Sequence, residues 1–115
     1  MPMILYHNPQ CSKSRAALEL LRTRGVEPGI VEYLKVPPDR ETLSRILDLL
    51  GMEPRQIMRT KESAYRENHL HNPDLTRDEL IDAMVRNPRL IERPIAMTER
   101  GAVLGRPPEK VLDLL

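Results

Sequence analysis

The chain is poor in aromatic residues: it has three tyrosines and neither tryptophan nor phenylalanine. Proteins that bind single-stranded nucleic acid stack bases on aromatic side chains, so the composition argues against that class. The 18 basic and 17 acidic side chains nearly cancel, which leaves no broad positive surface for nucleic acid or an anionic membrane. We therefore expect an aliphatic core and neither kind of partner.

Long apolar runs and disulfides are also missing. No apolar run approaches the ~20 residues that span a bilayer, and the segment 1–9 lacks the basic and apolar regions of a signal peptide. Cys11 is the single cysteine, so no internal disulfide can form. These absences predict a cytoplasmic protein, and the 115 residues are enough for one compact domain.

The start of the chain has the pattern of a β-α-β unit. Short apolar segments over Met3–His7 and Gly29–Leu34 predict two strands. Between them, the apolar spacing predicts a helix from about Ser12 to Arg24 that stops at Gly25. Such a unit implies parallel strands joined by a right-handed crossover.

The segment of about 38–90 is predicted to be a helical insertion. Asp39 is expected to cap one helix, and Pro54 to begin another short one. Thr76 and Glu79 have the spacing of a capping box in front of a third helix. These start signals are local, so they predict where helices begin but not how the helices pack.

Two strands and a last helix are predicted after the insertion, while the polar segment 60–75 shows no clear periodicity. The strands cover Arg93–Met97 and Ala102–Gly105, and the helix starts at Pro107 or Pro108. The complete order predicts an α/β fold of the thioredoxin-like kind. A helical insertion separates its βαβ unit from its C-terminal β-hairpin and helix, within a single domain over residues 1–115.

Cys11 lies where a polar loop meets the first predicted helix. Free N–H groups at a helix start favour negative charge, which lowers the pKa of a thiol and also attracts external anions. His7, Lys13 and Arg15 add positive charge nearby, and the hydroxyls of Ser12 and Ser14 are positioned in sequence to donate to a thiolate. The alternative is that a lone cysteine is a small buried hydrophobe, but its polar neighbours favour a reactive thiol.

Familiar alternatives for a cysteine site fail on spacing. A C-x-x-C redox pair needs cysteine at Ser14, and a C-x5-R phosphatase loop needs arginine at Ala17. His69 and His71 are far in sequence from Cys11, so we expect a surface role for them and no metal site.

The stretch "HNPQCSKSR" resembles the H-N-P-x-C-x-x-S-R loop of the arsenate reductases linked to glutaredoxin and glutathione. The resemblance continues through "VEYLKVPPDRETL", "IMRTKE", "LIDAMVRNPRLIERPI" and "VLGRPPEKVLDLL". The resemblance covers almost the whole chain in order. The chain looks like a member of a short branch of that family. The loop departs from the better-known members at Ser12-Lys13, where they tend to have Gly-Thr.

The resemblance implies a set of catalytic residues. Cys11 matches the nucleophile, and Arg59, Arg93 and Arg106 match three arginines that surround the oxyanion. A planar guanidinium grips such an anion through paired N–H donors. Spreading the negative charge would also help a thiolate approach an anion that would otherwise repel it.

The resemblance also implies four supporting residues. His7 and Ser14 match residues that support the thiolate, and Pro94 matches the proline that is usually cis in thioredoxin folds. Arg15 is expected to lie on the first helix and to close the anion loop.

The implied reaction is reduction of arsenate to arsenite without a bound cofactor. Cys11 attacks arsenic, glutathione attacks the adduct, and glutaredoxin resolves the mixed disulfide. Because the chain has no second cysteine, the resolving thiol has to come from another molecule.

A different class stays open as an alternative. Redox regulators of the same fold bind RNA polymerase and sense oxidation through a C-x-x-C pair. Such a protein would have no arsenate reductase activity. Ser14 removes the disulfide switch here, whereas the three arginines fit the enzyme.

Overall fold

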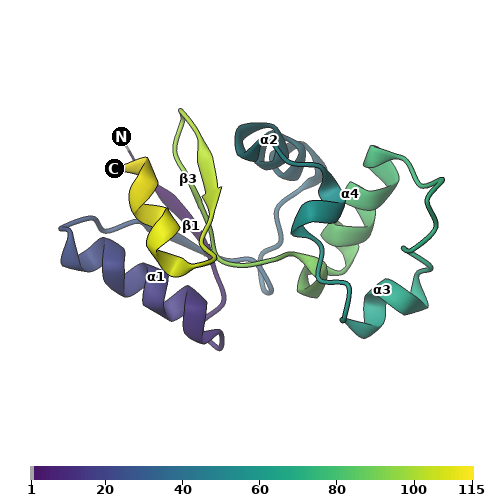
Figure 1. The fold of residues 1–115 in the computed structure, drawn as a ribbon, viewed down its shortest axis with the longest axis horizontal. Helices are drawn as coiled ribbons and strands as arrows, with labels where there is room; N and C mark the ends of the chain where they lie inside the picture. Colours follow the sequence, from purple (N-terminus) through teal and green to yellow (C-terminus); the bar gives the residue numbers. More distant parts are fainter. Residues whose placement is uncertain (1) are drawn as a thin grey trace. The chain divides into compact units, whose positions relative to one another are not determined.

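A computed structural model describes residues 2–115 of the chain. The chain divides into two compact units (Figure 1). The sheet unit combines the N-terminal segment up to Val36 with Arg93–Leu115, and the helical unit is Pro37–Glu92. The helical unit begins and ends within two residues of the insertion predicted at about 38–90. The two units are described separately below.

The sheet unit contains four short strands in the order β2-β1-β3-β4. They are β1 (Ile4–His7), β2 (Gly29–Glu32), β3 (Ile95–Met97) and β4 (Ala102–Leu104). Strands β1 and β2 are parallel, whereas β3 is antiparallel to both β1 and β4. This arrangement confirms the predicted thioredoxin-like α/β fold.

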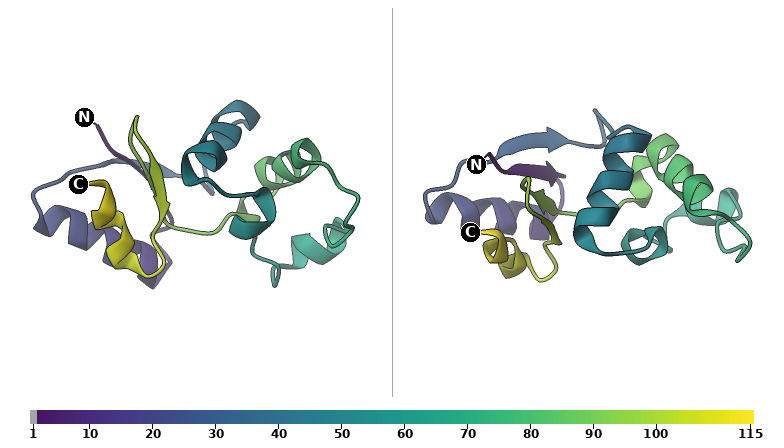
Figure 2. Two further views of the ribbon diagram at one scale, coloured as in Figure 1. Left: turned by 45° about the horizontal axis from the view of Figure 1, so that its top comes forward. Right: turned by 90° about the horizontal axis from the view of Figure 1, so that it is seen from above.

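Two helices cover one face of this sheet, as Figures 1 and 2 show. Helix α1 (Ser12–Thr23) packs beside η3 (Pro108–Leu114), a 3₁₀ helix at the end of the chain. They meet the sheet through a cluster of buried hydrophobic residues: Met3, Leu5, Ala17, Leu18, Leu21, Ala96 and Val111. The aliphatic core predicted from the composition is confirmed, although Tyr6 and Tyr33 are buried as well.

Three elements of the sheet unit differ from the expected pattern: β2, the closing helix, and β3, which begins at Ile95 rather than at Arg93. Strand β2 stops at Glu32 rather than continuing to Leu34, because the N–H groups of Lys35 and Val36 both turn back to the carbonyl of Glu32. The closing helix forms as predicted, but with the 3₁₀ pattern. The Arg93–Pro94 bond is cis, as the resemblance implied, and so is Arg106–Pro107.

The helical unit is built around α2 (Arg40–Leu50) and α4 (Arg77–Arg86), which pack against each other. Asp39 caps α2 by accepting a hydrogen bond of 2.8 Å from the Thr42 N–H. Thr76 and Glu79 form the predicted capping box at the start of α4. The start signals in the sequence are therefore confirmed.

Three short helices complete the unit, and one lies in the segment that had no predicted element. They are the 3₁₀ helices η1 (Pro54–Ile57) and η2 (Pro88–Leu90) and the α-helix α3 (Ser63–Glu67). The segment that follows α3 is held by Arg55, which donates 2.6 Å hydrogen bonds to the carbonyls of Leu70 and Asn72. Within residues 2–115, no helix combines the length and apolar character needed to cross a bilayer.

Candidate functional site

The loop that leads from β1 to Cys11 is fixed by its own hydrogen bonds. The Cys11 N–H donates to the carbonyl of Asn8 at 3.0 Å, and the Gln10 N–H donates to Oδ1 of Asn8 at 3.0 Å. Arg15 clamps the same loop from α1, because its Nη1 donates to the carbonyl of Pro9 at 2.9 Å. Cys11 is therefore held as the N-cap residue of α1, with extended backbone angles.

The surroundings of Cys11 stabilise its thiolate. Partial burial raises the pKa of the thiol, but hydrogen bonds from the Ser14 backbone, the Arg93 side chain and the Lys13 backbone outweigh that effect. The positive charge of Arg93 acts in the same direction, so the net pKa is lowered. The thiol is free and half-buried, so it is both activated and within reach of a small reactant.

A buried polar pair supports the first turn of α1. Nδ1 of His7 and Oγ of Ser14 lie 2.6 Å apart in a hydrogen bond, and the Asn8 N–H donates to the same oxygen at 3.0 Å. Both side chains are almost fully buried. Since Ser14 also hydrogen-bonds the sulfur through its backbone, the pair fixes a group that stabilises the thiolate.

The cis-proline corner places two arginines together. Nη1 of Arg106 donates to the carbonyl of Arg93 at 3.0 Å, and the Gly105 N–H donates to the carbonyl of Pro94 at 2.8 Å. Gly105 is required here, because a Cβ at this position would lie 2.7 Å from Cγ of Pro94. The corner holds Arg93, the arginine that hydrogen-bonds Cys11.

Arg59 belongs to the helical unit and is described there. An isolated β-bridge between Met58 and Ile91 precedes it, and the Arg59 N–H donates to the carbonyl of Leu90 at 2.7 Å. Its guanidinium lies 3.3 Å from a carboxylate oxygen of Glu62 and 3.8 Å from one of Glu92. The convergence of Arg59 with Cys11 on one oxyanion stays a prediction.

A loop that places an activated cysteine at a helix start, beside an arginine before a cis-proline, is the arrangement that the resemblance implied. A model of the ArsC family matches residues 6–114. The chain belongs to the ArsC family.

Full-length relatives and a solved structure agree with this membership. The chain is 50% identical over 112 residues to the uncharacterized protein YfgD of Escherichia coli, with 96% of this chain and 94% of that protein covered. It is 46% identical over 117 residues to an arsenate reductase of Neisseria meningitidis, with both chains fully covered. The structure of an arsenate reductase from Vibrio cholerae superposes with a TM-score of 0.96 at 46% identity, and the match covers 100% of this chain and 98% of that one.

Two predicted contributions to the ArsC site need correction. His7 was expected to add positive charge, but burial lowers its pKa below the ordinary 6.5, so the ring is neutral at pH 7. The Ser14 hydroxyl was expected to donate to the thiolate, but it is bonded to His7, and the Ser14 backbone N–H takes that role. The first correction follows from the burial of His7, and the second from its contact with Ser14, seven residues away in sequence. Local patterns reveal neither.

Other features of the ArsC site were not foreseen from the sequence. These are the anchoring of Arg106 on the Arg93 carbonyl and the two carboxylates beside Arg59. Each joins residues distant in sequence or pairs common surface charges, so no motif marks them. Across residues 2–115, His, Cys, Asp and Glu side chains form no group of three or more able to hold a metal.

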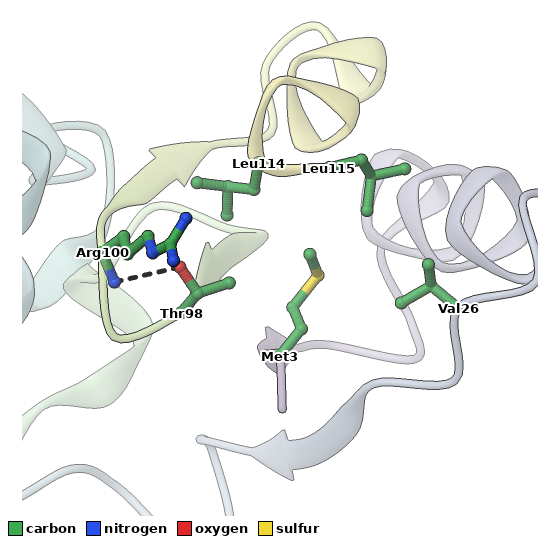
Figure 3. Close-up of a pocket in the computed structure, with 6 residues that line it drawn as sticks. All are labelled: Met3, Val26, Thr98, Arg100, Leu114 and Leu115. Atoms are coloured by element: carbon green, nitrogen blue, oxygen red, sulfur yellow. Dashed lines mark hydrogen bonds between the residues drawn. The ribbon is translucent and has the colours of Figure 1, made fainter. Parts of the chain in front are cut away.

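Two pockets lie at opposite ends of β1. The loop pocket, of about 150 Å³, is lined by residues 7–10 and by Glu32, Leu34 and Lys35. The second, of about 300 Å³, is lined by Met3, the hairpin residues Thr98 and Arg100, and residues near the C-terminal end of η3 (Figure 3). The loop pocket is therefore the one that adjoins the segment leading to Cys11.

Proposed function

We propose that this protein reduces arsenate to arsenite through the single nucleophile Cys11, in the cytoplasm and without a resident cofactor. The observation that carries the proposal is the activated thiol of Cys11 beside Arg93 at the start of α1. Membership of the ArsC family and the arsenate reductases among its relatives support the choice of substrate.

In the first step, the Cys11 sulfur attacks arsenic and forms an S–As bond. Starting from the thiol and singly charged arsenate, one water leaves and the bound arsenic stays in oxidation state V. Arg93 and Arg106 are proposed to bind the oxyanion, together with Arg59, because guanidinium groups neutralise the charge that would repel a thiolate. The His7–Ser14 pair would keep the Ser14 N–H aimed at the sulfur, with Arg15 and Pro94 holding the loop and the corner.

In the second step, the thiol of glutathione attacks Cys11. The new S–S bond forms as the S–As bond breaks, and the bonding electron pair leaves with arsenic, which becomes arsenite in oxidation state III. The uptake of one proton completes the balance. Glutaredoxin then removes glutathione from Cys11 by thiol–disulfide exchange, because the chain has no second cysteine for this step.

The test is single-turnover arsenate reduction by the wild type and by Cys11→Ser. Wild type with glutathione and glutaredoxin is expected to form arsenite. With glutathione alone it should stop after one equivalent, as the mixed disulfide seen by mass spectrometry. Cys11→Ser should form none above the rate without protein, and equal activity of the two proteins would overturn the proposal.

A further inference from the structure

We infer that the loop pocket is the subsite that binds the γ-glutamyl end of glutathione and directs its thiol toward Cys11. This inference rests on the proposed function, because it names the place where the reducing co-substrate binds. The starting observation is that one wall of the pocket is the segment 7–10, which ends next to the nucleophile. Asn8, in that wall, accepts the hydrogen bond from the Cys11 N–H.

The charges of the pocket match the end of a peptide that carries an α-amino acid group. Nζ of Lys35 lies 3.6 Å from Oε1 of Glu32, so an ammonium and a carboxylate stand side by side. The γ-glutamyl end of glutathione carries the complementary pair on one carbon, an α-ammonium and an α-carboxylate. Glu32 would bind the ammonium and Lys35 the carboxylate.

The Glu32–Lys35 pair can exchange its partners at low cost. The two side chains are 42% and 77% exposed, respectively, and ion pairs between exposed groups contribute little to stability. Replacing their mutual contact with contacts to a ligand therefore costs little folding stability. Pro9 and Leu34 provide an apolar surface in the same pocket for the methylene groups of the γ-glutamyl chain.

The pocket is large enough to enclose part of a glutathione molecule but not the whole of it. Its volume of about 150 Å³ is below the ~300–1,000 Å³ of pockets that enclose a drug-sized ligand. One arm of an extended tripeptide fits, and the rest continues outside. Because the glutamyl residue is linked through its side chain, eight covalent bonds separate the α-ammonium nitrogen from the thiol sulfur, roughly 10 Å when extended. That reach suits a pocket that ends at Gln10, one residue before Cys11.

The test uses the variant Glu32→Gln/Lys35→Gln, which keeps the side chains similar in size and removes both charges. In steady-state arsenate reduction, the KM for glutathione should rise by about tenfold. Bound arsenate should protect Cys11 from alkylation equally well in this variant and in the wild type. The matched control is Arg22→Gln/Glu27→Gln, which removes an exposed ion pair near the other end of α1 and should leave the KM unchanged.

A second measurement isolates the γ-glutamyl group. Cysteinylglycine lacks that group, so the wild type should prefer glutathione to it, and the Glu32→Gln/Lys35→Gln variant should lose most of the preference. An equal preference in both proteins, or an unchanged KM for glutathione, would overturn the inference while leaving the arsenate reductase proposal intact.

A binding experiment tests the pocket without any turnover. S-methylglutathione cannot react, and in an NMR titration it should shift the backbone amides of Gln10, Leu34 and Lys35 in the wild type but not in the double variant. Shifts confined to the pocket around Met3 would overturn the inference. If S-methylglutathione binds as expected but no arsenate is reduced, the subsite stands and the proposed reaction fails.

Discussion

The sheet unit and the helical unit bury different kinds of side chain. In the sheet unit, His7 and Ser14 are buried polar residues, and they support the turn that carries Cys11. In the helical unit, every buried side chain that the structure describes is apolar. A hydrogen-bonded polar pair fixes geometry, whereas an aliphatic core mainly supplies stability. The contrast predicts that thiol reactivity and folding stability respond to different substitutions.

The largest effect on stability is expected from a truncation in the helical unit. Leu47 in α2 is fully buried, so Leu47→Ala should lower the free energy of unfolding by about 2–5 kcal/mol. Leu49→Ala, at a half-buried position of the same helix, is the control and should cost less. Urea denaturation measures both. The pH profile of Cys11 alkylation should not move in folded Leu47→Ala. A shift would show that a substitution in the core of the helical unit also changes the reactivity of the thiol.

The next effect comes from overpacking the cis-proline corner of the sheet unit. In Gly105→Ala, the new Cβ would lie 2.7 Å from Cγ of Pro94 and 3.1 Å from Cγ1 of Val111. The expected loss is about 1–3 kcal/mol of unfolding free energy, together with slower alkylation because Arg93 shifts. Gly101→Ala is the control, since its Cβ would meet only Leu114 at 3.8 Å. Equal stability of the two variants would contradict the expected clash.

A smaller effect, confined to the thiol, is expected from Arg93→Gln. Removing the charge and its hydrogen bond should raise the pKa of Cys11. Alkylation at pH 7 should become about tenfold slower, equivalent to about 1.4 kcal/mol. Arg100→Gln is the control, because Arg100 is an exposed arginine in the hairpin. An unchanged rate in Arg93→Gln would show that the helix start alone activates the sulfur.

The smallest effect is the pH dependence contributed by His7. Burial lowers the pKa of His7 below its ordinary 6.5, so the unfolded chain binds the proton more readily than the folded one. Stability is then fully present above pH 6.5 and falls as the pH drops toward the folded-state pKa. Urea midpoints measured from pH 7 to pH 5 should decrease for the wild type and change less for His7→Gln. A steeper decrease of the urea midpoint in His7→Gln would contradict a His7 pKa that is lower in the folded chain than in the unfolded chain.

Local signals in the sequence predicted most of the elements. The capping residues Asp39 and Thr76 and the stop at Gly25 act within one turn of helix, so their effects can be inferred from neighbouring residues. Helix α3 was missed because it buries no side chain and so has no apolar periodicity. The segment after it is held by hydrogen bonds from Arg55, which lies about 15 residues away in sequence.

The candidate site could be predicted only where its features depend on residues that are close in sequence. The activation of Cys11 by a helix start is a local effect, and spacing indicated it. The contribution of Arg93 was available only through the resemblance, because 82 positions separate it from Cys11 (93 − 11). The loop pocket was not foreseen, since Glu32 and Lys35 look like ordinary surface charges until the end of β2 turns them toward the 7–10 segment.

The strand order β2-β1-β3-β4 has a consequence for synthesis on the ribosome. Strand β3, the inner neighbour of β1, comes from the last quarter of the sequence. A nascent chain therefore completes the contiguous segment Pro37–Glu92 while the sheet still lacks two strands. During that interval Cys11 has been translated but Arg93 has not, so a newly made chain carries its sulfur without one of the groups that lower the pKa of the thiol.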